Sequence, residues 1–331
     1  MRDLLTGPNL ARLICLLILI LLPLVVPSPY IRHLLIITFI YAMVASNWDL
    51  SLGYAGVFNF GHIAFFAAGC YGSAILSKTI GITPWLTIPL AGIIGVIAAL
   101  IVCLPVLRLK GIYVVLVTFA FSQLCFQLVL SQEEITGGSM GMPLLPPLKI
   151  GDYNFARDGK FGYYYVGLFL LVLSTIYLHR LVRSRFGTSI VALRDNEDYA
   201  ISRGISLARQ RMLTLGLSAF FTGVAGGFYS TYVRVASPEI FGFGFLSLAL
   251  SMLLLGGLNS IYGPILGAFV ITLLSEAMVD LGPMRFLIIS ALIILMLLFY
   301  PGGLNNALQQ AYKWSSRSGA AARLFRTNAR N

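Results

Sequence analysis

The sequence predicts an all-α polytopic membrane protein, a bundle of about ten transmembrane helices. Hydrophobic residues make up 58% of the 331-residue chain, and charged residues only 11%, roughly half the share of a soluble domain, which is about 25%. The mean hydropathy is +0.87. A soluble protein cannot cover this much apolar surface with so few charges. The apolar residues also gather in runs of membrane length, about 20 residues.

Ten apolar runs are candidate spans. In chain order they cover residues 13–27, 33–50, 55–77, 84–107, 112–131, 163–181, 212–233, 243–258, 263–280 and 285–300. The first run follows basic residues and resembles a signal peptide, but it ends in Pro27 with no small-x-small cleavage site, so we interpret it as a retained helix. The first and eighth runs are short, and the break at Gly256 and Gly257 is soft. Counts of nine to eleven helices therefore stay open.

The connecting segments complete the predicted organisation. We expect one transmembrane domain over residues 1–303, followed by a basic tail at 304–331. The segment 131–162 is too polar and too rich in Gly and Pro to be a span, so it is an expected outer loop. The segment 183–211 is an expected inner segment, with helical character from Thr188 to Arg203.

The basic residues predict the orientation of the bundle. If both termini are cytoplasmic, as ten spans require, sixteen Lys and Arg residues lie inside and seven lie outside. Cytoplasmic loops carry such an excess. The net charge of +11 therefore indicates orientation in a bacterial inner membrane. It does not indicate nucleic-acid binding, because long apolar runs separate the basic residues.

Several kinds of site are absent from the sequence. It has no GxxxxGK[ST] motif for nucleotide phosphates and no HExxH or CxxC metal pattern. Proton-driven carriers usually have several ionisable residues at mid-membrane depth. Here only Glu276 and Asp49 come near, both close to predicted span ends. The chain is therefore expected to hold no metal or cofactor, to catalyse no reaction and to take its energy from another subunit.

The inner segment has the pattern of a docking element. Ser189 is the expected helix cap, and Gly204 is expected to end the helix in a left-handed conformation. A lipid-surface helix held by arginines is the alternative. Three acidic residues, Asp195, Glu197 and Asp198, weigh against it because anionic lipid repels carboxylates.

Five motifs carry a resemblance to a known family, and their order and spacing hold over about residues 35–300. Ala192 to Ile205 resembles the cytoplasmic coupling segment of ABC importer permeases, LivM-type branched-chain amino acid permeases above all. The segments Gly53–Phe66, Leu107–Ala120 and Gly256–Ala268 are similar to other family motifs, although Asn259 stands where Gly is usual. The outer Thr136, Gly137, Gly138 and Gly141 match the family's T-G-G-x-x-G loop.

The resemblance implies the membrane subunit of an ATP-driven importer. Such a permease translocates Leu, Ile, Val or related amino acids brought by an extracytoplasmic solute-binding protein. It pairs with a second permease, usually LivH-type, and with two ATPase subunits that bind ATP and Mg. Permeases for urea or short amides share most of the motifs and are the alternative substrate class. An ion-coupled carrier that works alone is the alternative of another class.

The same resemblance, with the polarity of the residues, gives the candidate site residues. The ATPase-coupling set is Arg194, Asp195, Asn196, Glu197, Asp198, Ala200, Gly204 and Ile205. The outer gate set is Thr136, Gly137, Gly138 and Gly141, and the helix-break set is Gly256, Gly257, Asn259, Gly263 and Pro264. For the break, an ordinary tight turn is favoured over a half-helix N-terminus that faces an anion.

The translocation path has five candidate residues: Asn59, His62, Thr118, Gln123 and Gln127. Polar side chains in hydrocarbon need partners, so these residues either line a path or tie neighbouring helices together. The glycines between Gly53 and Gly72 are expected in one span. For each of them, tight helix packing is favoured over an unwound, cavity-lining stretch.

Overall fold

The computed structural model describes residues 7–26, 28–151, 153–156, 159–299 and 302–304. Within these residues, ten helices have 14 residues or more: α1 (Gly7–Val25), α2 (Pro29–Asp49), α3 (His62–Lys78), α4 (Pro84–Val106), α5 (Ile112–Ser131), α7 (Phe161–Val182), α10 (Leu207–Val233), α11 (Phe243–Gly256), α12 (Gly263–Ala277) and α13 (Met284–Phe299). Each predicted span overlaps one of them, which confirms the all-α prediction. Residues 305–331 of the predicted basic tail lie outside the described residues.

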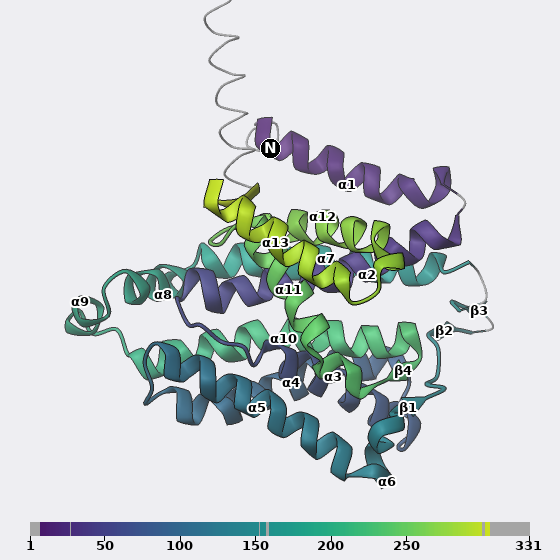
Figure 1. Ribbon diagram of the computed structural model, residues 1–331, viewed down its shortest axis with the longest axis horizontal. Helices are drawn as coiled ribbons and strands as arrows, with labels where there is room; N and C mark the ends of the chain where they lie inside the picture. The colour runs from purple at the N-terminus through teal and green to yellow at the C-terminus, as the bar shows by residue number, and fades with distance from the viewer. Residues whose placement is uncertain (1–6, 27, 152, 157–158, 300–301, 305–331) are drawn as a thin grey trace, which may run out of the picture.

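Shorter elements lie at the two ends of the bundle. They are α6 (Glu133–Thr136), α8 (Arg185–Asp195), α9 (Glu197–Ser202), β1 (Met142–Pro143), β2 (Lys149–Ile150), β3 (Tyr153–Asn154), β4 (Val235–Ala236), a π-helical turn (Leu50–Tyr54) and 3-10 turns at Gly138–Met140, Pro238–Phe241 and Val279–Leu281. Strand β1 pairs antiparallel with β4, and β2 with β3. Helices α8 and α9 extend from one end, whereas the strands and α6 lie at the other (Figure 1).

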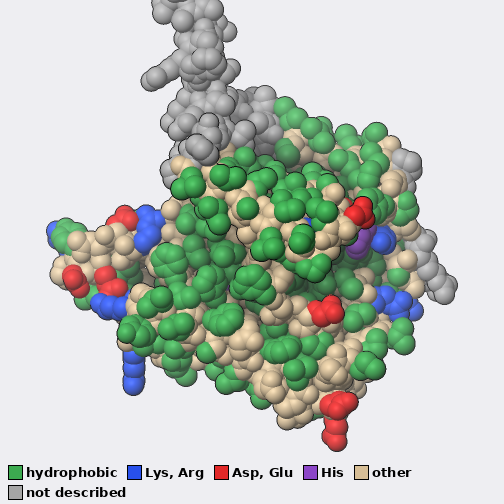
Figure 2. Space-filling model, viewed as in Figure 1, with side chains coloured by type: hydrophobic (Ala, Val, Ile, Leu, Met, Phe, Trp, Pro, Cys, Tyr) green, Lys and Arg blue, Asp and Glu red, His purple; other side chains and the backbone are tan. Residues whose placement is uncertain are grey.

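The two ends correspond to the predicted sides of the membrane. At one end, Lys78 donates to the Pro143 carbonyl at 3.0 Å and Arg234 to the Leu145 carbonyl at 2.9 Å; all four residues belong to predicted outer segments. At the other end, Lys110 pairs with Glu197 at 2.6 Å. Figure 2 shows hydrophobic side chains across the middle of one face, with Lys and Arg mainly at its two ends. We call these the outer end and the inner end.

Glycines let the central helices approach closely. A Cβ on Gly69 of α3 would lie 2.2 Å from the Gly223 carbonyl oxygen of α10, and one on Gly226 would lie 2.0 Å from the Phe66 oxygen. Backbones can meet at this distance only where side chains are missing. The packing role expected for the glycines is therefore confirmed at Gly69.

The prediction of one continuous span over 55–77 is wrong at its beginning. Helix α3 begins at His62, and residues 56–60 have no helical structure. Gly53 lies in the π-helical turn and Gly56 has a φ of +65°. The first break, as we call residues 55–61, is thus an unwound stretch. The glycine pattern is compatible with an unwound stretch, although it favours tight helix packing.

The spanning helices differ in how far their own chain covers them. Of the most apolar 18-residue window, 83% of residues are buried in Pro29–Tyr54 but only 17% in α5. In the part of the chain that the structure describes, five helices are long and apolar enough to cross a membrane, and shorter apolar helices accompany them. Helix α5 therefore presents most of its surface outward.

Candidate functional site

The predicted coupling segment forms two short helices at the inner end. Helix α8 ends at Asp195, and the side chain of Asn196 caps α9 by accepting a hydrogen bond from the Tyr199 backbone N–H at 3.0 Å. The single helix expected from Thr188 to Arg203 is wrong, because this cap divides it. Ser189 is not a cap either, since its hydroxyl donates to the Arg185 carbonyl within α8.

The end of the segment agrees with the sequence. Gly204 has a φ of +87°, the left-handed conformation expected where the helix stops. No atom lies within 4 Å of a Cβ built there, so the residue is open to a partner. Ala200 is 2% exposed, whereas Tyr199 and Ile201 are 58% and 44% exposed. Helix α9 thus buries its alanine and presents two large apolar side chains outward.

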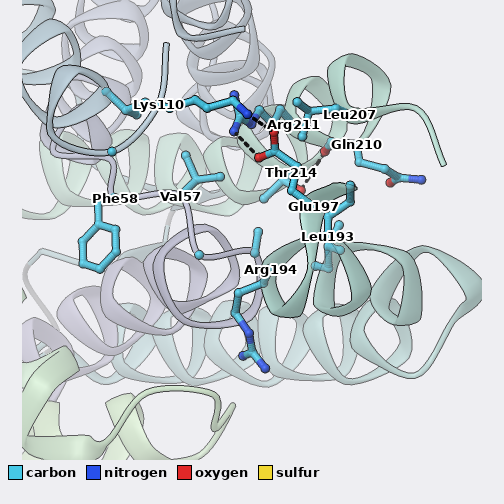
Figure 3. Close-up of a pocket in the computed structure, with 15 residues that line it drawn as sticks. Val57, Phe58, Lys110, Leu193, Arg194, Glu197, Leu207, Gln210, Arg211 and Thr214 are labelled. Atoms are coloured by element: carbon cyan, nitrogen blue, oxygen red, sulfur yellow. Dashed lines mark hydrogen bonds and ion pairs between the residues drawn. The ribbon is translucent and has the colours of Figure 1, made fainter. Parts of the chain in front are cut away.

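Two ion pairs of Glu197, which we call the ion bridge, fix the coupling segment to the bundle. Glu197 pairs with Lys110 at 2.6 Å and with Arg211 of α10 at 3.2 Å. The hydrogen bond to Glu197 raises the pKa of Lys110 above its ordinary value. A cleft of about 230 Å³ lies beside this bridge, between α8, α10 and the first break (Figure 3). No pattern in the sequence indicates that Lys110 and Arg211 pair with Glu197.

Arg194 connects the coupling set to the helix-break set. Its side chain points away from the ion bridge (Figure 3). It donates to the side-chain oxygen of Asn259 and, at 3.1 Å, to the carbonyl oxygen of Gly53. Two groups of residues predicted separately are therefore in contact at the inner end.

The helix break itself is a tight loop, as favoured from the sequence. Gly257 and Asn259 have φ values of +95° and +60°, and Asn is among the few non-glycine residues that adopt this conformation readily. A Cβ on Gly256 would lie 2.1 Å from the Gly263 oxygen. Pro264 is in the first turn of α12. We call residues 257–262 the second break.

A carboxylate does face the second break, but it belongs to the chain. Asp49 is fully buried and accepts hydrogen bonds from the backbone N–H groups of Asn259 at 3.1 Å and Ser260 at 3.0 Å. The sequence indicates Asp49 only as an acidic residue near the end of a predicted span. Its partners lie 210 residues away in the chain, so no local pattern could have indicated them.

Three of the five path candidates surround the first break. Asn59 accepts from the Gly61 N–H at 2.7 Å, and Thr118 of α5 accepts from the Phe60 N–H at 3.0 Å. His62 stacks on Trp48, with ring centroids 5.6 Å apart, and its Nε2 is buried without a hydrogen-bond partner. Trp48, missed in the sequence, also donates to the Asn59 carbonyl at 2.7 Å.

The other two path candidates lie elsewhere. Gln123 and Gln127 are exposed on α5. They share one face of the helix, as their spacing predicts. A polar pair on the outside of a spanning helix calls for a partner subunit or a path beside it.

The outer gate set forms a closely packed turn. Thr136 donates to the Val129 carbonyl at 2.6 Å and accepts from the Gly138 N–H at 3.2 Å. Gly137 and Gly141 have φ values of +76° and +68°. A Cβ on Gly141 would lie 2.3 Å from the Ala236 oxygen, where β1 meets β4. Among the described residues, no three His, Cys, Asp or Glu side chains gather as a metal site.

Comparison with known proteins gives a consistent result. The family model "Branched-chain amino acid transport system / permease component" matches residues 30–300. The high-affinity branched-chain amino acid transport system permease protein LivM of Salmonella typhimurium is 31% identical over 288 residues, 81% of this chain and 68% of the relative. LivM of Escherichia coli is 30% identical over the same shares. A probable LivH permease of Methanocaldococcus jannaschii is 26% identical over 67% of this chain and 71% of the relative. No solved structure matches the chain with statistical significance.

Proposed function

The chain belongs to the branched-chain amino acid transport permease family, and from that premise we propose that it carries leucine, isoleucine and valine inward as one membrane subunit of an ATP-driven importer. The family is that of a multi-pass permease component of an ABC system, which has no ATPase activity of its own. Substrate and partners are the finer part of the proposal. The similarity to two LivM proteins supports the substrate class.

The proposed partners are a second, LivH-type permease, two ATPase subunits that bind ATP and Mg, and a solute-binding protein outside. The sparse cover of α5, with 17% of its apolar window buried, supports a second permease against that helix. Gln123 and Gln127 would then line the path between the two subunits, whereas Thr118 of the same helix is buried against the first break. The outer turn around Thr136 lies at the end where the solute-binding protein would dock.

The observation that carries the coupling proposal is the form of α9. This helix extends from the inner end (Figure 1) and presents Tyr199 and Ile201 to solvent. Exposed aromatic and aliphatic side chains on a short projecting helix are suited to a groove on another protein. We place this end in the cytoplasm of a bacterium, with both termini of the chain on the same side of the inner membrane.

Two glycines allow a matched test of the dock, by which we mean the proposed contact between α9 and the ATPase subunits. Gly204 at the inner end and Gly151 at the outer end both have positive φ, +87° and +58°, and neither has an atom within 4 Å of its Cβ position. We expect Gly204→Arg to abolish co-purification of the ATPases and ATP-dependent uptake, while Gly151→Arg retains both. Normal assembly and uptake in Gly204→Arg would contradict the dock.

The substrate is tested separately with the wild-type complex in proteoliposomes. Uptake of labelled leucine, isoleucine or valine that needs ATP and the cognate solute-binding protein is the expected result. Uptake of urea or a short amide in their place would reassign the substrate and leave the dock unchanged. Uptake without any ATPase subunit would overturn the proposal in favour of an ion-coupled carrier.

A further inference from the structure

Three segments far apart in the sequence meet at one point of the inner end. They are the π-helical turn Leu50–Tyr54 with Asp49 before it, the last turn of α8 with Arg194, and the second break. Single π-helical turns are frequently found at functional sites. The contacts among the three segments are of two kinds, polar and apolar.

Asp49 holds the second break to the end of α2. Both carboxylate oxygens accept backbone N–H groups, one from Asn259 and one from Ser260. A carboxylate buried in an apolar bundle is costly unless it is hydrogen-bonded. A Cβ on Gly53 would lie 2.0 Å from an Asp49 oxygen and 2.8 Å from the Asn259 nitrogen. Glycine at 53 thus leaves the space in which the carboxylate and the loop meet.

Arg194 closes the arrangement from the coupling helix. Its guanidinium donates to Gly53, to Asn259 and to Asp195, so one planar group reaches three acceptors. The side chain passes over Gly56, where a Cβ would lie 2.7 Å from the Arg194 Cγ. Its donors are set in a fixed fork, which orients the groups that it joins.

An apolar contact supports the polar one from a second side. Ile190 of α8, Ile261 of the second break and Leu50 of the π-helical turn pack in one buried cluster with Leu178 of α7. The same three segments are therefore joined twice, by independent groups.

We propose that Asp49 and Arg194 form an inner clamp, a positioning device that transmits the movement of α8 to the second break and to the first break. The inference rests on the proposed function, because it supposes that the ATPases move the coupling segment. The clamp reaches the α11–α12 loop through Asn259 and Ser260. It reaches the first break through Gly53 and Gly56, a few residues before Asn59 and His62. Asp49 and Arg194 are positioning residues and touch no substrate.

The test compares uptake with ATP hydrolysis in the full complex. Wild type, Arg194→Gln, Asp49→Asn and Gly56→Ala are reconstituted with the ATPases and the solute-binding protein, and both rates are measured in the same vesicles. Gly56→Ala displaces Arg194 without changing a polar group. Arg180→Gln is the matched control, an exposed arginine of α7 at the same end.

Each of the three clamp variants should assemble and hydrolyse ATP while transporting about tenfold less substrate per ATP, which is within the usual range of coupling between sites. Arg194→Lys, which keeps the charge but loses the fork, should give an intermediate ratio, and Arg180→Gln a normal one. A merely structural role would lower both rates in parallel with the amount of assembled complex, and that result would overturn the clamp. Normal ratios in Arg194→Gln and Asp49→Asn would overturn it too. If the wild-type complex fails to assemble or to import, the proposed function fails instead.

Discussion

The two breaks in the bundle satisfy their backbone in different ways. In the first break, polar side chains bind the free groups, as Thr118 does for the Phe60 N–H and Asn59 for the Gly61 N–H. In the second break, the Asp49 carboxylate binds two backbone N–H groups, and the flanking backbones also pack directly together, so that a Cβ on Gly256 would meet the Gly263 oxygen. Irregular backbone at membrane depth must be satisfied within the protein. The comparison teaches that both breaks use side-chain acceptors, whereas the second also depends on direct contact between backbones, which requires glycine at position 256.

The largest expected effect is on the second break. Gly256→Ala places a methyl group 2.1 Å from the Gly263 oxygen. The atoms nearest to this methyl group all belong to the backbone, so the two segments must separate. We expect a loss of about 3 kcal/mol of stability, the upper range for overpacking. The midpoint of thermal unfolding of the purified complex measures it. Gly216→Ala in α10 is the control, since its nearest contact is 3.7 Å away. Equal midpoints for the two variants would contradict the contrast.

The next effect is on the first break. Thr118→Val removes the acceptor of the partly buried Phe60 N–H, and an unpaired buried donor costs about 1–3 kcal/mol. The same midpoint measurement applies. Thr38→Val is the control, because the buried Thr38 hydroxyl donates only within its own helix, to Leu34. If the Thr38 variant loses as much stability, the bond to the first break has no special weight.

A smaller effect is expected at Trp48. Trp48→Phe removes the donor to the Asn59 carbonyl but keeps an aromatic ring beside His62, so the loss should be about 1 kcal/mol. Trp85→Phe removes a comparable bond to the Lys149 carbonyl at the exposed outer end, where water replaces it. A larger loss at Trp85 than at Trp48 would show that the first break does not depend on this bond.

The smallest effect is expected at Asn259. Asn259→Gly relieves a φ of +60° and loses the bond from Arg194, while the backbone N–H to Asp49 is retained. The two changes oppose each other, so stability should move by no more than about 0.5 kcal/mol. Transport per ATP should fall only slightly, since Arg194 keeps Gly53. A loss as large as that of Gly256→Ala would show that the Asn259 side chain matters to the second break as much as the backbone contact at Gly256, and would erase the contrast.

Most of the architecture could be predicted from the sequence. Runs of apolar residues place the ten long helices because lipid imposes both a length and a polarity on a span. The first break could not be predicted, because glycine serves both close helix packing, as at Gly69, and unwound backbone, as at Gly56. The division between α8 and α9 could not be predicted either, because Asn196 fits a continuous helical pattern in the sequence but caps α9 in the structure.

The candidate site could be predicted only in pieces. Motifs gave Arg194 and Asn259 as members of separate sets, and polarity gave Asn59 and His62. What joins them is tertiary: Asp49 lies 210 residues from Asn259, and Trp48 reaches Asn59 across a turn. The positions of Gln123 and Gln127 depend on which side of α5 the bundle covers, and an apolar helix with little amphipathic character does not indicate that.

The outward surface of α5 has a consequence for how the protein is made. Two amide side chains, Gln123 and Gln127, lie exposed on a helix that its own chain barely covers. In a lone subunit those amides would face hydrocarbon, at a cost that only pairing removes. If the proposed second permease covers this face, a cell that produces this chain alone should accumulate a poorly tolerated subunit that membrane proteases can attack. The exposed amides on one face of α5 would therefore require balanced synthesis of the two subunits.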